Sequence, residues 1–106
     1  MLGDRKAFVN IDKATATKTA AIAAPGAGKH IEIDHYSLLA DGGANTVTLT
    51  FGTTVVIEAD LQANASMVFD APLHNPLQTG VNEAFNIQLS AATSVVGFII
   101  YRIVGE

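Results

Sequence analysis

Three side chains that can ligate metals stand at alternate positions in the segment KHIEIDHY. His30, Glu32 and Asp34 follow one another at i, i+2 and i+4, and a β-strand projects residues of this spacing from one face. Imidazole and carboxylate groups bind zinc and other divalent metals. Together with His35 or His74, these three residues are therefore a weak candidate for a mixed nitrogen and oxygen metal site.

Cupin enzymes hold metals on jelly-roll strands in a similar way, but they carry a second His on the same strand and a further His on another strand. Here His74 belongs to a Pro-containing loop. The competing interpretation of His30, Glu32 and Asp34 is a solvated polar face, which strands of this kind usually have. We favour this interpretation, and we expect neither a bound metal nor a cofactor.

The segment APGAGKH, Ala24 to His30, is similar to the end of a phosphate-binding loop. Gly28 and Lys29 fit the pattern G-x-x-x-x-G-K-[ST], but Ala23 stands at the first glycine position and His30 at the hydroxyl position. The alternating segment that follows predicts a strand, whereas phosphate binding needs a helix N-terminus there. We interpret the segment as a turn. No G-x-S-x-G nucleophile elbow occurs either, so we expect a protein that is not an enzyme.

The composition indicates a single domain that contacts another protein chain. Of the 106 residues, 49% are hydrophobic and only 15% are charged, and the mean hydropathy is +0.33. Such a chain covers its own surface poorly, so part of its apolar area is expected to contact another chain. The six basic residues are scattered and the net charge is −4, which disfavours a nucleic-acid partner. The apolar run Val95–Tyr101 is too short for a membrane-spanning helix, so no membrane partner is expected.

Apolar and polar residues alternate with a period of two along most of the chain, which predicts strands. In NTVTLTF, Val47 and Leu49 fall on one face, as Ile87 and Leu89 do in EAFNIQLS. Turn segments such as PGAG and DGGAN separate these runs. A long loop from Asp70 to Asn82 is expected to cross between sheets. This pattern predicts an all-β fold, an antiparallel two-sheet β-sandwich of the jelly-roll type. We predict about eight strands, near residues 5–11, 15–23, 29–39, 46–51, 54–58, 60–69, 83–90 and 94–104.

The C-terminal segment SVVGFIIYRIV is apolar in both of its alternating sets, which indicates a strand covered on both faces. We expect the odd-numbered set to face the core and the even-numbered set to contact a neighbouring subunit. The alternative is a central strand covered by a loop of the same chain. The candidates for the subunit interface are Val96, Phe98, Ile100, Arg102 and Val104.

The N-terminal segment mixes charged and apolar residues before the regular alternation begins. We interpret residues 1–14 as an arm or an edge strand and residues 15–106 as the jelly-roll domain. An arm would reach onto another protein. The candidate contacts with that protein are Leu2, Arg5, Lys6 and Phe8.

Two long segments resemble a group of small virion proteins of tailed bacteriophages. They are AGKHIEIDHYSLLADGGANTVTLTFGTT and NEAFNIQLSAATSVVGFIIYRI, and the resemblance covers residues 17 to 104. The positions that carry it are mainly turn glycines and strand residues: Gly28-Lys29, Gly42-Gly43, the Thr-Val-Thr strand, Gly52-Thr53-Thr54, Asn86, Leu89-Ser90-Ala91 and Gly97. The segment His30-Glu32-Asp34 and the loop Asp70–Asn82 depart from the pattern of that group.

This resemblance implies a jelly roll, commonly a trimer, that decorates or cements the phage capsid. Under this hypothesis the chain is a homotrimer on the capsid exterior, bound to the major capsid protein, and it is present in the host cytoplasm during assembly. The segment containing Leu2, Arg5, Lys6 and Phe8 would then contact the capsid. The alternative is a head-fibre or tail component that binds a host-surface glycan, which the lack of aromatic residues in Asp70–Asn82 disfavours.

Overall fold

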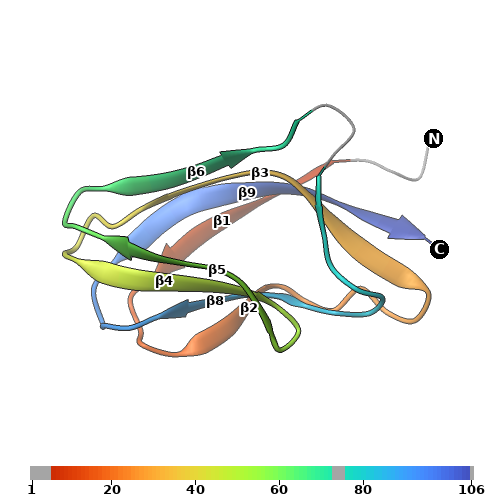
Figure 1. Ribbon diagram of the computed structural model, residues 1–106, viewed down its shortest axis with the longest axis horizontal. Coiled ribbons are helices and arrows are strands. Elements are labelled where there is room, and N and C mark those ends of the chain that lie inside the picture. Colours follow the sequence, from red (N-terminus) through yellow and green to blue (C-terminus); the bar gives the residue numbers. More distant parts are fainter. Residues whose placement is uncertain (1–5, 73–75, 106) are drawn as a thin grey trace.

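The computed structural model describes residues 6–72 and 76–105 of the chain (Figure 1). These residues form strands and turns, without a helix. The strands are β1 (Ala7–Lys13), β2 (Lys18–Ile22), β3 (Lys29–Leu39), β4 (Asn45–Phe51), β5 (Thr54–Leu61), β6 (Ser66–Asp70), β7 (Leu77–Gln78), β8 (Phe85–Leu89) and β9 (Val95–Gly105).

The strands form two antiparallel sheets packed face to face. The five-stranded sheet has the order β1-β9-β3-β6, with the short β7 also paired to β3, and the four-stranded sheet has the order β2-β8-β4-β5. Without β7, this is the strand order of a jelly roll, in which the chain crosses repeatedly between the two sheets. Figure 1 shows the two layers, with β5 and β6 along one open side of the sandwich. The predicted fold class is confirmed.

One hydrophobic core lies between the sheets, built from the inward sets of the alternating strands. The inward faces predicted for NTVTLTF and EAFNIQLS are confirmed, because Val47, Leu49, Ile87 and Leu89 are all buried. The core also contains Ile31 and Ile33 from β3 and Val95 and Ile99 from β9, together with Ile11, Ile22, Tyr36, Leu38, Ala40, Leu61, Met67 and Phe85.

The prediction of one continuous strand near residues 60–69 is wrong. The chain turns at residues 62–65, so that β5 ends at Leu61 and β6 begins at Ser66 in the other sheet. Asn64 has a φ of 66°, a left-handed conformation that Asn tolerates better than most residues, and the Ala65 amide donates a hydrogen bond of 3.0 Å to the Gln62 carbonyl. The alternation across this turn depends on Ala63 and Ala65, whose small side chains suit either face.

The other boundaries shift by a few residues. The segments predicted near 5–11 and 15–23 become β1 and β2, and β5 extends three residues beyond the predicted 54–58. The predicted crossing loop includes β7, which pairs with Glu32 and Ile33 of β3. Residues 7–13 form β1, which is an edge strand of the five-stranded sheet. Leu2 and Arg5 lie outside the described residues.

The central pair β3 and β9 contains two irregularities that set its geometry. A register shift between Ile33 and His35 places Asp34 in a bulge, so that both Asp34 and His35 reach the outer face of the sheet. At Gly97, a Cβ atom would lie only 1.8 Å from the carbonyl oxygen of Ser37 on β3. This approach of the two backbones leaves room for glycine alone.

Candidate interaction surface

The outer face of the five-stranded sheet is built around alternate residues of β9. Because Ile99 and Val95 are buried in the core, their even-numbered neighbours project outward. Phe98 is in register with Asn10 of β1 and Ser37 of β3, and Ser37 in turn pairs with Val68 of β6. The side chains of four adjacent strands therefore share this face.

An apolar patch occupies the middle of this face. The ring of Phe98 stacks on Phe8 at a centroid distance of 5.5 Å and on His35 at 5.3 Å, which makes an aromatic row across three strands. Phe8 and Val68 are each 61% exposed. We call this surface the apolar outer patch, and it consists of Phe8, Val68, Val96, Phe98 and Ile100.

The outer face of the four-stranded sheet has a different character. Its central positions carry hydroxyl and amide side chains, and Thr46 donates a hydrogen bond of 2.6 Å to Asp60. Thr48 donates a hydrogen bond of 3.3 Å to Glu58. Val55, at the end of the β4–β5 hairpin, is a large apolar residue on this face and is 60% exposed. One outer face of the sandwich is therefore largely polar, while the other carries the apolar outer patch.

An ionic cluster adjoins the apolar outer patch at the far end of β9. The Arg102 guanidinium lies 3.1 Å from Asp34 Oδ1 and 3.4 Å from Glu32 Oε1, and the side chains of these acids are only 15% and 16% exposed. Lys6 Nζ lies 3.5 Å from Asp34 Oδ2, and His30 Nε2 lies 2.9 Å from Glu32 Oε2. Such partly desolvated charges are tolerated because each has an opposite charge beside it.

The three candidate metal ligands lie together in this ionic cluster, where the Arg102 guanidinium bridges Glu32 and Asp34. Among the described residues, no three His, Cys, Asp or Glu side chains are grouped so that they could hold a metal ion. His35 instead stacks on Phe98 and lies 3.5 Å from Asp70 Oδ1. His74 lies outside the described residues.

The residues predicted for the subunit interface all lie on β9 and project from the outer face, with Arg102 in the ionic cluster. Of the predicted capsid contacts, Phe8 belongs to the apolar outer patch, and the Lys6 side chain is 63% exposed. Leu2 and Arg5 lie outside the described part of the chain. The structure thus brings Phe8 and the even-numbered residues of β9 together on one surface, and contact with a partner stays a prediction.

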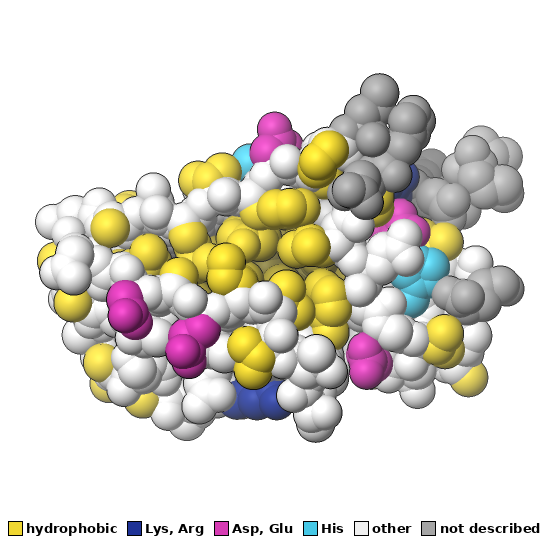
Figure 2. Space-filling model, in the orientation of Figure 1, with side chains coloured by type: hydrophobic (Ala, Val, Ile, Leu, Met, Phe, Trp, Pro, Cys, Tyr) yellow, Lys and Arg dark blue, Asp and Glu magenta, His cyan; other side chains and the backbone are white. Residues whose placement is uncertain are grey.

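A second apolar surface lies along the open side of the sandwich, between the edge strands β5 and β6. Figure 2 shows apolar side chains gathered there, at the centre of the visible face. Ile57 on β5 is 39% exposed, and Ala59 and Phe69 are half-buried against the core. Because β5 and β6 are edge strands, this side also presents main-chain groups that no strand of the described chain pairs with.

Sequence reasoning missed a buried amide that organises one end of the sandwich. Asn45 is 5% exposed, and its Nδ2 donates to Ala91 O, Thr93 O and Thr93 Oγ1 at 2.9–3.2 Å. Its Oδ1 accepts from the amides of Ser90 and Ala91 and from the Ser90 hydroxyl. One side chain therefore holds the loop between β8 and β9, and the position of Asn45 at the start of an alternating run was the signal available.

Burial also affects a tyrosine inside the sandwich. Tyr36 is 4% exposed and stacks on Phe69 at a centroid distance of 5.5 Å. Desolvation raises the pKa of its phenol above the usual value, because burial penalises the charged phenolate. Tyr36 therefore stays neutral over the physiological range and acts as a packing residue.

Comparison with known proteins shows the fold. No protein-family model matches the chain, and no curated protein matches it. A subunit of the Bacillus endospore appendages, described as a novel family of disulfide-linked pili, is similar with a TM-score of 0.54 and 20% identity, covering 94% of this chain and 85% of that one. The virus-like particle of the extra small virus of the giant freshwater prawn Macrobrachium rosenbergii contains a second similar chain, with a TM-score of 0.54 and 13% identity, covering 97% of this chain and 80% of that one.

Both similar structures are β-fold proteins of assembled structures, a pilus and a virus-like particle. The 106 residues contain no cysteine, so the disulfide linkage described for the pilus cannot form between them. Among the described residues, no helix has the length and hydropathy that a membrane span requires.

Proposed function

We propose that the chain is a structural subunit of a virion, a decoration or cement protein that binds the assembled capsid from outside as a trimer. The apolar outer patch carries this proposal. A lone subunit would expose two aromatic rings and several branched side chains on this face, whereas the outer face of the other sheet is largely polar. An apolar core with stacked aromatic residues is the usual centre of a protein–protein interface.

The surroundings of the patch suit such an interface. The ionic cluster of Arg102, Glu32 and Asp34 lies at its end, where a polar rim would fix the register between subunits. A trimer would present three copies of its capsid-binding surface at once, and this multivalency raises the apparent affinity for the shell. Because such a protein binds only the assembled shell, its binding stabilises the shell by mass action. The major capsid protein is the proposed partner.

The proposed role is structural and not enzymatic. Two solved structures of similar fold belong to a pilus and to a virus particle, which supports an assembly role. The resemblance of residues 17 to 104 to small phage virion proteins supports a place on a phage capsid, with assembly in the host cytoplasm.

The test compares two valines with nearly equal exposure on opposite sheets. Val68 lies on the outer face of the five-stranded sheet and is 61% exposed, and Val55 belongs to the four-stranded sheet and is 60% exposed. A single charge at either site costs the isolated subunit little stability, because both side chains already face water. Light scattering should report a trimer for the wild type and for Val55→Glu, and a monomer for Val68→Glu.

The same three proteins are then mixed with purified capsid shells that lack the protein, and co-sedimentation is measured. The wild type and Val55→Glu should sediment with the shells, and Val68→Glu should bind at least tenfold more weakly because it loses multivalent contact. A wild-type chain that is monomeric and ignores the shells would refute the proposal. So would a trimer that Val55→Glu disrupts and Val68→Glu leaves intact.

A further inference from the structure

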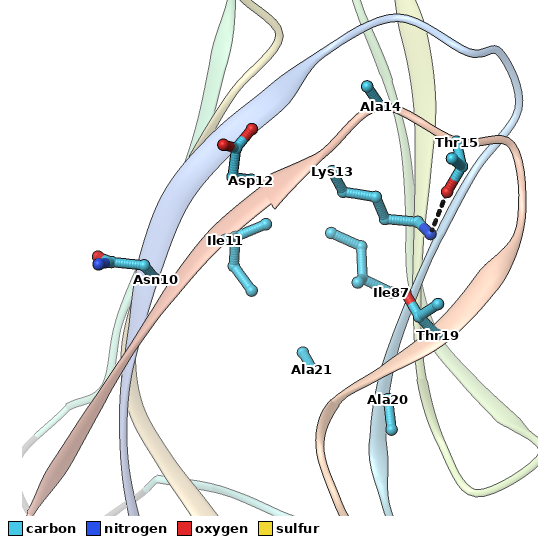
Figure 3. Close-up of a pocket in the computed structure, with 10 residues that line it drawn as sticks. All are labelled: Asn10, Ile11, Asp12, Lys13, Ala14, Thr15, Thr19, Ala20, Ala21 and Ile87. Carbon is cyan, nitrogen blue, oxygen red and sulfur yellow. Dashed lines mark hydrogen bonds between the residues drawn. The ribbon is translucent and has the colours of Figure 1, made fainter.

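A hollow opens between the two sheets on the side where β1 and β2 pass each other (Figure 3). Its volume is ≈ 350 Å³, and its lining comes from β1, from the turn after β1, from β2 and from Ile87 on β8. Both β1 and β2 are edge strands. The hollow is therefore open to a group that approaches from outside the sandwich.

One charged side chain extends into this hollow from β1. Lys13 shares the inward set with Ile11 and is only 8% exposed, whereas Asp12 points away on the other side of the strand (Figure 3). The Lys13 ammonium donates hydrogen bonds of 3.2 Å to Thr15 Oγ1 and of 3.2 Å to Thr17 Oγ1. It makes no ion pair with any described residue.

The Lys13 side chain is buried and its ammonium is part-buried without a counter-charge among the described residues, so desolvation penalises the charged form. Burial accordingly lowers the pKa of Lys13 below its ordinary value of 10.5. Three charged groups elsewhere on the same sheet, Arg102, Glu32 and Asp34, are each compensated by an opposite charge. Lys13 differs from them in having neutral partners alone.

The hydrogen bonds leave donors available in the hollow. An ammonium has three N–H donors, and two of those of Lys13 are used by Thr15 and Thr17. The two threonine oxygens lie 3.0 Å apart, so one hydroxyl donates to the other and the second hydroxyl keeps its hydrogen. One N–H donor of Lys13 and one O–H donor of the threonine pair thus remain, Lys13 and Thr15 both line the hollow, and a carboxylate can accept from both kinds of donor.

We propose that this hollow is a binding site for a carboxylate group, with Lys13 as its counter-charge and Thr15 and Thr17 as additional polar contacts. The apolar side chains of Ile11, Ala21 and Ile87 line the hollow beside the ammonium and would pack against the short carbon chain of the ligand. A cation is disfavoured by the charge of Lys13.

The carboxylate has two possible sources, a free short-chain acid or an Asp or Glu side chain of a second copy. The chain has ten acidic and six basic residues, so carboxylates are in excess on its surface. Only the second source rests on the proposed assembly role.

The test follows the ε-carbon resonance of Lys13 in uniformly labelled wild-type protein by NMR. In a solution of the unassembled subunit, sodium acetate replaces sodium chloride at constant ionic strength. Lys18, an exposed lysine on β2, is the internal control. A saturable shift at Lys13 that Lys18 does not share supports a free carboxylate ligand. No shift with acetate, but a Lys13 pKa that rises when the subunits assemble, supports the side chain of a second copy.

An unchanged Lys13 resonance under both conditions would overturn the proposal. The variants Thr15→Val and Thr17→Val keep the volume of the side chain and remove one donor each. Because the threonine that remains in either single variant still offers its hydroxyl hydrogen, the decisive protein is the double variant Thr15→Val/Thr17→Val. In it the acetate affinity should fall at least tenfold, as expected for the loss of a hydrogen bond to a charged group, or the assembly-linked change at Lys13 should be lost. The acetate titration needs no assembly, so its outcome is independent of whether the proposed capsid role is right.

Discussion

Gly97 lies where the two central strands of the five-stranded sheet approach most closely, and we predict that Gly97→Ala strongly destabilises the fold. A Cβ at this position would lie 1.8 Å from the Ser37 carbonyl oxygen and 2.8 Å from the Ser37 carbonyl carbon. Both atoms belong to the backbone of β3, so no side-chain rotation can relieve the contact. The φ of Gly97 is also +157°, a conformation that L-residues rarely adopt.

The cost has two parts. Separating two paired strands to admit an extra methyl group is overpacking, which typically costs about 1–3 kcal/mol. A positive φ for a residue with a Cβ adds about 1–2 kcal/mol. We therefore expect the free energy of unfolding to fall by about 2–5 kcal/mol, and the melting temperature of a domain of this size to fall by roughly 10–20 °C.

Two control glycines separate these contributions. Gly105, on the same strand, has nothing within 4 Å of a built Cβ and no positive φ, whereas Gly26 has open space but a φ of +111°. Thermal unfolding followed by circular dichroism should show a change below about 0.5 kcal/mol for Gly105→Ala. Gly26→Ala should lose about 1 kcal/mol through its backbone conformation. A Gly97→Ala protein as stable as the Gly26→Ala protein would refute the close-contact argument.

Two further predictions concern buried polar groups. Asn45→Asp loses the amide donors that bind Ala91 and Thr93, so urea unfolding should show that the free energy of unfolding falls by about 2–4 kcal/mol. The control Asn10→Asp, at an exposed position, should change it by less than about 0.5 kcal/mol. Equal effects of the two substitutions would contradict the assigned role of Asn45. The folded-state pKa of Lys13 lies below the ordinary value of 10.5. Between these two pKa values the unfolded chain therefore binds more protons than the folded chain. The stability of the wild type relative to Lys13→Met should thus rise with pH across this window and level off above it. Urea unfolding of both proteins in carboxylate-free buffers tests this, and parallel pH profiles of their stabilities would show that Lys13 is not desolvated. Tyr36 is present in both proteins, so its titration cancels from the difference between them.

Much of the fold could be predicted because strand alternation is a local property. Which side chains of NTVTLTF and EAFNIQLS face the core depends on the period of two alone, and the structure confirms both faces. The same period placed Phe98 and Ile100 together on the outer side of β9. The prediction went wrong at residues 62–65, where Ala63 and Ala65 are too small to distinguish a strand from a turn.

The candidate site required the tertiary structure, because its members come from strands far apart in the chain. The spacing of His30, Glu32 and Asp34 indicated a shared face, but that Arg102 lies between two of their carboxylates depends on the pairing of β3 with β9. The stacking of Phe8 on Phe98 likewise depends on the pairing of β1 with β9.

The sequence by itself determined the strand faces and the sandwich class, since the period of alternation is a property of neighbouring residues. That the low charge content indicates a partner stays a prediction. The tertiary structure decided which side chains meet. It placed the Lys13 side chain in a hollow between two edge strands, and it left no room for a Cβ at Gly97. These outcomes depend on register, bulges and the crossing of the chain between sheets, which are set by long-range contacts and leave little local signal.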